Sequence, residues 1–586
     1  IANEIIHSSD YDVVNGFMNA KYDFAPWLRA SLRTGVDVYT EREIWRNSIG
    51  ACGGWNKKGY YEEQRKGGYS VNNDIIISAD KKFGDFSIDV FVGTSLYFYQ
   101  DDVLNGKTSN GITIPGYYSL KASVDPAKVY STIKKKQVNS LYGKVSGSWK
   151  STLFLDITAR NDWSSTLPVE TRSYFYPSIS GSLVISELFN MPQWFDFWKI
   201  RASWTQTKSD LGVYETDRSY SISTNLWDNM NGATYPTTMR STLVEPSATR
   251  TYEIGTGMHF LKNRLQVDIA YYNKLYYNLT KKAAISDACG FEYTLINTDE
   301  EHVRKGVEVT VSANIIQSKD WDWITTFNWS LDRYYYSKID PIYSTQKDWV
   351  KPGERWDWLG YYDWERDPYG NIIHDNGYPI QSKYQSVAGY ENPDWIFGFN
   401  NTVRYKDFTL SFTLDGRIGG VAHSVMDQAL WMTGAHRDSD TFWRYDEVVN
   451  GNKSYIGEGV KVVSGSVEYD SQGHIVSDTR VFDLNDKAVS YEGYMKLYNG
   501  AGNVWNAKHQ HILKQTFIKL RELSLNYNIP QNICNKIGMK RASIAFVGNN
   551  LFLLTKDFKF SDPDKATENL NSPSLRMLGC NIKINF

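Results

Sequence analysis

The sequence predicts an all-β protein, an antiparallel β-barrel that crosses a membrane. Two-residue periodicity along the 586 residues gives about seventeen strand candidates. Long and short connections alternate between these candidates, and aromatic residues make up 15% of the chain, with 41 tyrosines and 20 tryptophans. Amphipathic rings of this kind suit the two interfaces of a membrane, where one end of the side chain lies in lipid and the other in water.

The alternation of connections predicts an orientation as well as a membrane. Six connections span only a few residues each, at 23–24, 83–85, 149–151, 262–263, 316–319 and 407–408. Six are long, at 41–69, 101–134, 211–248, 278–302, 339–395 and 421–514. Outer-membrane barrels have short turns on the periplasmic side and long loops outside the cell. We therefore expect the long segments to be extracellular and the chain to lie in the outer membrane of a Gram-negative cell.

The last strand carries the clearest pattern. Leu578, Ile582 and Phe586 share one face of 577–586, and Asn581 and Lys583 share the other. Similar alternation occurs at 153–160, 265–272 and 522–529. A strand with lipid on one face and a wet lumen on the other requires this alternation. For 577–586, an edge strand of a soluble sheet is the alternative.

The strand count indicates that part of the barrel lies elsewhere. If Phe586 ends in the periplasm, the segment 552–576 is an extracellular loop and 530–539 is a periplasmic turn. Single-chain bacterial barrels have an even number of strands with both ends in the periplasm, whereas about seventeen is odd. We infer that several N-terminal strands are absent from this chain.

Composition excludes some classes of function. The 64 Lys and Arg residues balance the 66 Asp and Glu residues, so nothing favours nucleic acid as a partner. No apolar run reaches the roughly 18 residues of a membrane helix. The cysteines, Cys52, Cys289, Cys534 and Cys580, lack a CxxC spacing, which disfavours a metal site and leaves a Cys52–Cys289 disulfide as a minor alternative.

Catalytic and metal-binding motifs are scarce. The sequence has no GxSxG, HExxH or P-loop motif, so we expect no enzyme activity and no catalytic residue. His509 and His511 could share a metal ion, but solvent-facing loop histidines are the favoured interpretation. Asp562 and Asp564 flank Pro563 and could bind Ca²⁺ in an extracellular loop, with a rigid turn as the alternative. We expect no other cofactor.

The informative chemistry of the loops is aromatic. Flat rings beside carboxylates and amides suit polar ligands with apolar C–H faces, such as sugars, and a peptide could use the same surface. Packing of the loops on themselves is the alternative for each residue. A short helix is expected at 424–435, as scaffold. The candidate ligand contacts are Trp356, Trp358, Tyr361, Tyr362 and Trp364 in the loop 339–395, and Trp431, Trp443 and Tyr445, with Trp505, in the loop 421–514.

Five segments share motifs with a known family, in that family's order. Residues 155–189 carry an R-x-D-x-S-S and F-P-S-x-S pattern through Arg160, Asp162, Ser164, Ser165, Pro177, Ser178 and Ser180. Residues 199–214 read KIRASWTQTKSDLGVY, and 389–420 contain the NP, NNT and DGRIGG elements of a hairpin. Residues 517–530 and 547–564 follow. Together these segments resemble the SusC-like family of TonB-dependent outer-membrane transporters.

The resemblance implies a larger protein than this chain. It implies a barrel of about 22 strands, of which residues 1–586 are the C-terminal part. The N-terminal plug, the TonB-interacting segment and the first strands then lie outside the chain. A SusD-like surface lipoprotein, the TonB–ExbB–ExbD complex and outer-membrane lipid are the implied partners.

The resemblance also implies a function. We expect TonB-dependent active import of a nutrient across the outer membrane, with an oligosaccharide as the favoured substrate and an oligopeptide as the alternative. A passive porin and a surface-binding barrel are the competing hypotheses. A hydrolase is disfavoured, because the sequence shows no paired nucleophile and base.

Overall fold

The computed structural model describes residues 4–51, 57–228, 230–500, 509–564 and 574–586. Its main feature is an antiparallel sheet of 17 strands, which confirms the predicted strand count. The chain divides into two compact units. The first comprises Ile1–Val184, Arg201–Tyr252 and Leu275–Glu301, and the second comprises Ile185–Ile200, Glu253–Lys274 and His302–Phe586. Among the described residues, no helix is long and apolar enough to cross a membrane.

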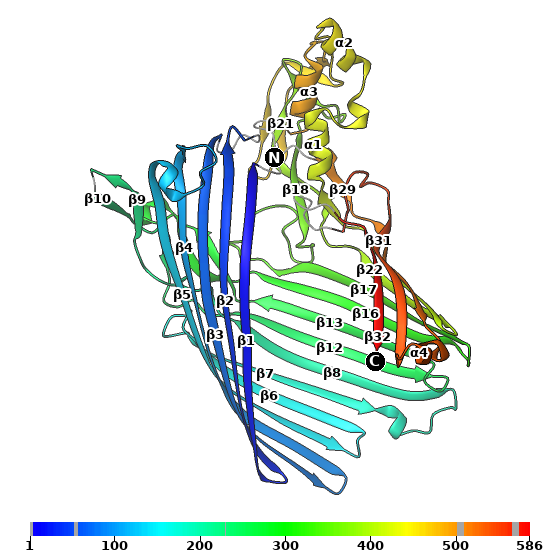
Figure 1. Cartoon of the computed structure of the whole chain (residues 1–586). Helices are drawn as coiled ribbons and strands as arrows, with labels where there is room; N and C mark the ends of the chain where they lie inside the picture. The colour runs from blue at the N-terminus through cyan, green and yellow to red at the C-terminus, as the bar shows by residue number, and fades with distance from the viewer. Residues whose placement is uncertain (1–3, 52–56, 229, 501–508, 565–573) are drawn as a thin grey trace. The chain divides into compact units, whose positions relative to one another are not determined.

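The first unit contains a meander of seven strands, each paired with the next (Figure 1). The strands are β1 Ile5–Ala25, β2 Leu28–Ile49, β3 Lys58–Phe83, β4 Phe86–Ile112, β5 Ser123–Trp149, β6 Leu153–Ser164 and β7 Ser173–Val184. Turns of two or three residues join β1 to β2, β3 to β4 and β5 to β6, close to the predicted short connections at 23–24, 83–85 and 149–151.

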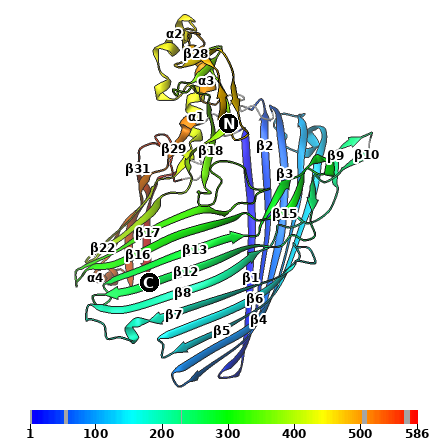
Figure 2. The ribbon, with the colours of Figure 1, turned by 180° about the vertical axis from the view of Figure 1, so that it is seen from behind.

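The second unit ends in a meander of six strands, each paired with the next. These are β17 Trp321–Lys338, β22 Trp395–Tyr405, β23 Phe408–Ile418, β30 Phe517–Asn528, β31 Arg541–Thr555 and β32 Met577–Asn585. Four further strands complete the sheet and are seen from behind in Figure 2: β8 Phe195–Ser209, β12 Ser247–Phe260, β13 Leu265–Tyr277 and β16 Glu301–Gln317. Short connections at 261–264, 318–320 and 406–407 match the prediction.

The two faces of the first meander differ in chemistry. Ile77 pairs with Val92, and these side chains are each 55% exposed although both are apolar. On the other face, Asp74 pairs with Ser95, and Ser95 pairs with Ser140. A barrel wall requires an apolar face toward lipid and a polar face toward the lumen, and these strands have both.

The prediction of long loops at 41–69 and 101–134 is wrong, because most of these residues belong to strands. β2 continues to Ile49 and β3 begins at Lys58, while β4 continues to Ile112 and β5 begins at Ser123. β3, β4 and β5 contain 26, 27 and 27 residues, or roughly 85–90 Å at about 3.3 Å per residue, against an apolar band about 25 Å tall. Strands that rise beyond the lipid have water on both faces, so hydrophobic alternation stops although the ladder of hydrogen bonds continues.

The other four long connections are loops with small elements of their own, as predicted. In the first unit they contain β9 Ser221–Trp227, β10 Met230–Thr234, β11 Thr238–Arg240, β14 Leu279–Ala284 and β15 Tyr293–Thr298. In the second unit the strands are β18 Trp358–Trp364, β19 Ile373–Asp375, β20 Tyr378–Pro379, β21 Gln381–Tyr390, β24 Val421–His423, β25 Val460–Ser464, β26 Val467–Tyr469, β27 Ile475–Asp478, β28 Val481–Leu484 and β29 Ile512–Lys514. The helices of these loops are α1 Val425–Thr433, α2 Phe442–Asn450 and α3 Tyr491–Tyr498, and α1 confirms the helix expected at 424–435. A further helix, α4 Gln531–Lys536, lies in the connection between β30 and β31, which was expected as a periplasmic turn.

Candidate functional site

The two longest loops fold together. β19, from the loop 339–394, pairs in parallel with β25, from the loop 419–516, and β25 pairs with β28. The helices α1, α2 and α3 lie in the same part of the second unit (Figure 1). We call residues 339–394 and 419–516 the loop region. Its pairings join segments almost a hundred residues apart in the sequence, so the loops have a defined structure of their own.

Trp364 lies in the core of the loop region. Its side chain is 2% exposed, and its ring stacks on Tyr498 with the centroids 5.6 Å apart. His374 and Tyr494 are also buried, and a 3.0 Å hydrogen bond joins ring nitrogen Nε2 of His374 and the hydroxyl group of Tyr494. Burial lowers the pKa of His374, so this imidazole stays neutral near pH 7. Trp364 therefore has a packing role, and we remove it from the candidate ligand surface.

The four other aromatic candidates of the first loop lie at or close to β18. Trp356 is 42% exposed and packs beside Tyr334, with the ring centroids 4.8 Å apart. Trp358 donates its indole N–H to the Tyr336 hydroxyl at 3.2 Å. Tyr361 and Tyr362 are both half-buried. Each of these rings has one packed side and one accessible part, as a ligand contact on a rigid support requires.

The three candidates of the second loop lie on α1 and α2. Trp431 on α1 stacks on His436, with the ring centroids 4.4 Å apart. Trp443 and Tyr445 on α2 are 40% and 59% exposed. A cavity of about 520 Å³ opens beside Trp431 and is lined also by Met432, Arg444, Glu447, Val448, Tyr491, Glu492, Met495 and Lys496. The structure thus brings one predicted residue, Trp431, to a cavity of ligand size.

Asp357 and Asp363 lie between the aromatic candidates of the loop 339–395, and both carboxylates already have hydrogen-bond partners. Arg355 donates two hydrogen bonds to Asp357, from Nε at 2.9 Å and from an Nη atom at 2.5 Å, and both side chains are buried. The same guanidinium lies 4.2 Å from the ring centroid of Tyr390. Asp363 accepts hydrogen bonds from the backbone N–H of Trp364 and from Arg366. These acids support the rings and do not face an open site.

The motif residues of 155–189 and 199–214 meet in the first unit. Ser164 donates a 2.5 Å hydrogen bond to Asp210, which also accepts one from Thr166 at 3.1 Å and an ion pair from Lys136 at 2.7 Å. Beside them, five apolar side chains form a small core: Leu167, Tyr174, Leu211, Val244 and Leu295. The motif therefore anchors the long loops that follow β8 and β13, together with the short connection that follows β6.

The Asp562–Asp564 segment faces two cations of its own chain. Lys519 is buried and lies 2.5 Å from Asp562 and 3.5 Å from Asp564. Arg521 pairs with Asp564 and, at 2.5 Å, with Asp415 of the DGRIGG motif. The backbone N–H of Asp564 donates to the Asp562 side chain at 3.1 Å. This arrangement favours the rigid turn over Ca²⁺, because each carboxylate already has a positive partner.

His511 belongs to a buried network that the sequence did not reveal. The ring lies in a short 3₁₀ turn, is 1% exposed, and its Nδ1 lies 2.7 Å from Asp427 on α1. Nε2 of His436 lies 3.5 Å from the same carboxylate. His509 is also largely enclosed, against Tyr361. The described residues contain no group of three or more potential metal ligands. Of the two histidines expected in solvent, His511 instead contacts α1 and His509 contacts Tyr361 on β18.

Two predictions fall outside the described residues. Trp505, an aromatic candidate of the second loop, and Cys52, one half of the disulfide considered above, lie in the ranges 501–508 and 52–56.

Comparison with known proteins shows what the chain is similar to. No protein-family model matches the chain. Two relatives from Formosa agariphila, TonB-dependent receptor P3 and TonB-dependent receptor P26, are 20% and 24% identical over 85% and 84% of this chain. The RagAB peptide transporter has a TM-score of 0.74 over 100% of this chain and 63% of its own, at 15% identity. Its "closed-closed" state gives a TM-score of 0.75 at 14% identity.

The chain resembles the barrels of SusC-like TonB-dependent transporters. Its place is the outer membrane. The SusC-like barrel spans about half the length of the curated relatives that it matches, 49% in each case. The exposed apolar face of β2–β5 is thus the lipid-facing wall, and the long connections are extracellular.

Proposed function

We propose that the SusC-like barrel takes part in TonB-dependent import of a polar nutrient, with an oligosaccharide as the first substrate class. The observation that carries this proposal is the loop region: a folded extracellular structure that holds Trp356, Trp443 and Tyr445 with substantial exposed ring surface. Rings fixed on helices and strands can stack on the C–H faces of sugars at little entropic cost. A passive pore does not require such a support.

The cavity beside Trp431 favours an oligopeptide as the second substrate class. Its lining combines Met432 and Met495 with both signs of charge, Arg444 and Lys496 against Glu447 and Glu492. Flexible thioethers adapt to varied apolar side chains, and paired charges suit a zwitterionic ligand. The similarity to the RagAB peptide transporter points the same way.

Exposed apolar side chains on α2 suit a protein partner. The exposed side of α2 carries Phe442, Val448 and Val449, which are 68%, 77% and 58% exposed. Apolar side chains grouped on one short extracellular helix suit a protein interface. We assign this surface to a SusD-like lipoprotein that closes over the loop region. Energy would come through a TonB-interacting segment outside this chain, and no residue here is assigned a catalytic role.

Binding measurements on the full-length protein test the substrate class. A Trp443→Ala, Tyr445→Ala double variant on α2 is compared with Val476→Ala, an exposed site on β27 of the same loop. For an oligosaccharide, we expect isothermal titration calorimetry to show at least about tenfold weaker binding in the double variant, since each lost ring contact is worth roughly 1 kcal/mol. The control should bind as the wild type does. Oligopeptide binding that both variants leave intact, with no oligosaccharide binding, would replace the first substrate class by the second.

A further inference from the structure

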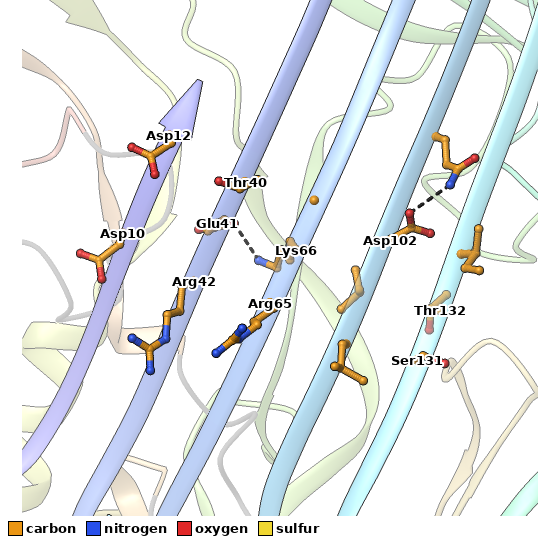
Figure 3. Close-up of a pocket in the computed structure, with 15 residues that line it drawn as sticks. Asp10, Asp12, Thr40, Glu41, Arg42, Arg65, Lys66, Asp102, Ser131 and Thr132 are labelled. Atoms are coloured by element: carbon orange, nitrogen blue, oxygen red, sulfur yellow. Dashed lines mark hydrogen bonds and ion pairs between the residues drawn. The ribbon is translucent and has the colours of Figure 1, made fainter. Parts of the chain in front are cut away.

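A polar groove lies on the lipid-facing side of β1–β5, immediately beyond the apolar wall. Its volume is about 860 Å³, and Figure 3 shows its lining from five neighbouring strands. The polar residues drawn there include Asp10, Asp12, Thr40, Arg42, Arg65, Asp102 and Ser131. Nothing in the import function uses this outward surface.

The strand register fixes where the groove begins. Val14, Val38 and Tyr69 pair in one rung and end the apolar face on β1–β3, whereas the same rung carries Gln100 on β4 and Lys135 on β5. Two residues further along each strand, the same face carries Asp12, Thr40, Gly67 and Asp102 in one rung. The rung after it carries Asp10, Arg42, Arg65 and Leu104.

This position corresponds to the headgroup layer of the membrane. Residues i and i+2 of a strand share a face and lie about 7 Å apart. On β1–β3, the first polar rung is therefore about 7 Å beyond the last apolar rung on the same surface. A groove on a lipid-facing wall at that distance meets lipid headgroups before it meets bulk water.

Two arginines in the groove are oriented so that their guanidinium groups can bind an anion. Arg42 and Arg65 are cross-strand partners, and each donates from Nε to the same oxygen of Glu63 at 3.0 Å. Glu63 thereby orients both guanidinium groups, whose side chains are 48% and 68% exposed. Because these bonds use Nε, the Nη atoms at the tips of the two forks can bind phosphate oxygens in a bidentate manner.

The rest of the lining suits sugar hydroxyl groups. Asp10, Asp12 and Asp102 supply carboxylate acceptors around the arginine pair, and Thr40 and Ser131 supply hydroxyl groups. Gln100 donates to Asp102 at 3.0 Å, which holds that carboxylate on the same face. A simple phosphate ester would be repelled by three carboxylates, whereas a sugar that carries both hydroxyls and a phosphate satisfies both kinds of group.

We propose that this groove binds the phosphorylated sugar headgroup of an outer-leaflet glycolipid. Arg42 and Arg65 hold the phosphate, and the surrounding carboxylates accept hydrogen bonds from the sugar hydroxyls. The acyl chains of such a lipid run along the apolar rungs that begin at Val14, Val38 and Tyr69. The bound glycolipid is a structural partner of the wall and is distinct from the imported substrate.

Native mass spectrometry of the full-length protein in detergent tests the proposal. The probe is a bisphosphorylated diglucosamine lipid, and the variant is Arg42→Gln with Arg65→Gln. The matched control is Arg29→Gln with Arg33→Gln, which removes two exposed arginines from the same strand near its other end. We expect the groove variant to lose at least about tenfold in apparent affinity, since two charge-assisted contacts are removed, and the control to bind as the wild type does. An Arg42→Lys, Arg65→Lys variant keeps the charges but not the forks, and should fall between them.

Two further probes identify the ligand. The dephosphorylated form of the same lipid should bind at least about tenfold less well than the phosphorylated form. Soluble glucosamine phosphate should not compete at equal concentration, because it lacks the acyl chains. Equal binding by the wild type and the Arg42→Gln, Arg65→Gln variant, equal binding of the dephosphorylated lipid, or full competition by the soluble sugar phosphate would each overturn the proposal.

Discussion

Ser164 donates a 2.5 Å hydrogen bond to Asp210, and this contact ties together two sequence motifs 46 residues apart. Ser164 and Thr166 are 1% and 3% exposed, and their hydroxyl groups hydrogen-bond each other at 3.0 Å as well as the carboxylate. The pair explains why both motifs occur in one protein: they fix the starting point of a long extracellular loop.

Replacement of Asp210 should loosen that loop. Asp210→Ala removes the acceptor of two buried hydroxyl groups and the partner of Lys136. We expect a loss of about 2–3 kcal/mol in local stability. Hydrogen–deuterium exchange over 211–246 should become faster in the variant. Asp217→Asn, an exposed site in the same loop, is the control and should leave exchange unchanged. Equal protection in all three proteins would show that the contact does not anchor the loop.

Trp364 and Tyr445 should behave in opposite ways. Trp364→Ala empties a packed site in the loop region and should cost about 3–5 kcal/mol, with loss of ordered structure there. Tyr445→Ala changes an exposed ring, so its stability should stay within about 0.5 kcal/mol of the wild type while ligand binding weakens. Protease sensitivity of the loop region and ligand titration measure the two effects. A stable Trp364→Ala protein with weakened binding would return that ring to the ligand surface.

The contact of His474 should depend on pH. Its ring bonds Asp470 through Nδ1 at 2.8 Å and Asp348 through Nε2, and these two carboxylates raise the pKa of His474. The hydrogen bond from His474 in turn lowers the pKa of Asp470 to about 2. Because the histidine pKa is raised, the contact is complete below the ordinary value of about 6.5 and is lost as pH rises through the raised value.

NMR titration of the His474 ring measures this prediction. We expect a transition above pH 6.5, together with faster amide exchange in the β26–β27 hairpin on the alkaline side of it. His474→Gln should remove the pH dependence of exchange in that hairpin. A ring that titrates at or below 6.5 would contradict the assignment.

Replacement of Lys519 alone should destabilise the protein more than replacement of Lys519 together with Asp562. Burial pushes the pKa of Asp562 upward, but the hydrogen bonds from Lys519, Ser574 and the Asp564 backbone, with the charge of Lys519, together hold that pKa below its ordinary value. Lys519→Met leaves that carboxylate buried and unpaired, which should cost about 3–5 kcal/mol. The double variant Lys519→Met, Asp562→Asn should regain part of that stability. Thermal unfolding compares the three proteins, and equal stability of the single and double variants would rule out a coupled pair.

The wall of the barrel could be predicted from sequence because lipid imposes a pattern. Alternation at 577–586 and 153–160 marks strands whose two faces meet different solvents, and both are strands in the structure. The pattern failed at 41–69 and 101–134, where β2–β5 rise beyond the lipid and charged residues pair across strands, as Glu41 does with Lys66. No hydrophobic signal marks a strand with water on both sides.

The loop region was harder to predict. The spacing of the predicted strands places Trp356, Trp364 and Tyr445 in long connections. Only the tertiary pairing of β19 with β25 decides which of these rings is buried. The ion pairs of Asp357 and Asp562 also join residues that the sequence could place only as loop acids. Side chains that look alike in the sequence therefore have two different roles: some are buried and hold the loops together, and others are exposed and can contact a ligand.

Uptake of a labelled oligosaccharide by cells that carry the full-length protein tests the central claim most directly. The proposed function predicts uptake that disappears when TonB is deleted and falls at least about tenfold in the Trp443→Ala, Tyr445→Ala variant at limiting substrate. Uptake that continues at the same rate without TonB would contradict active import and would identify the barrel as a passive pore.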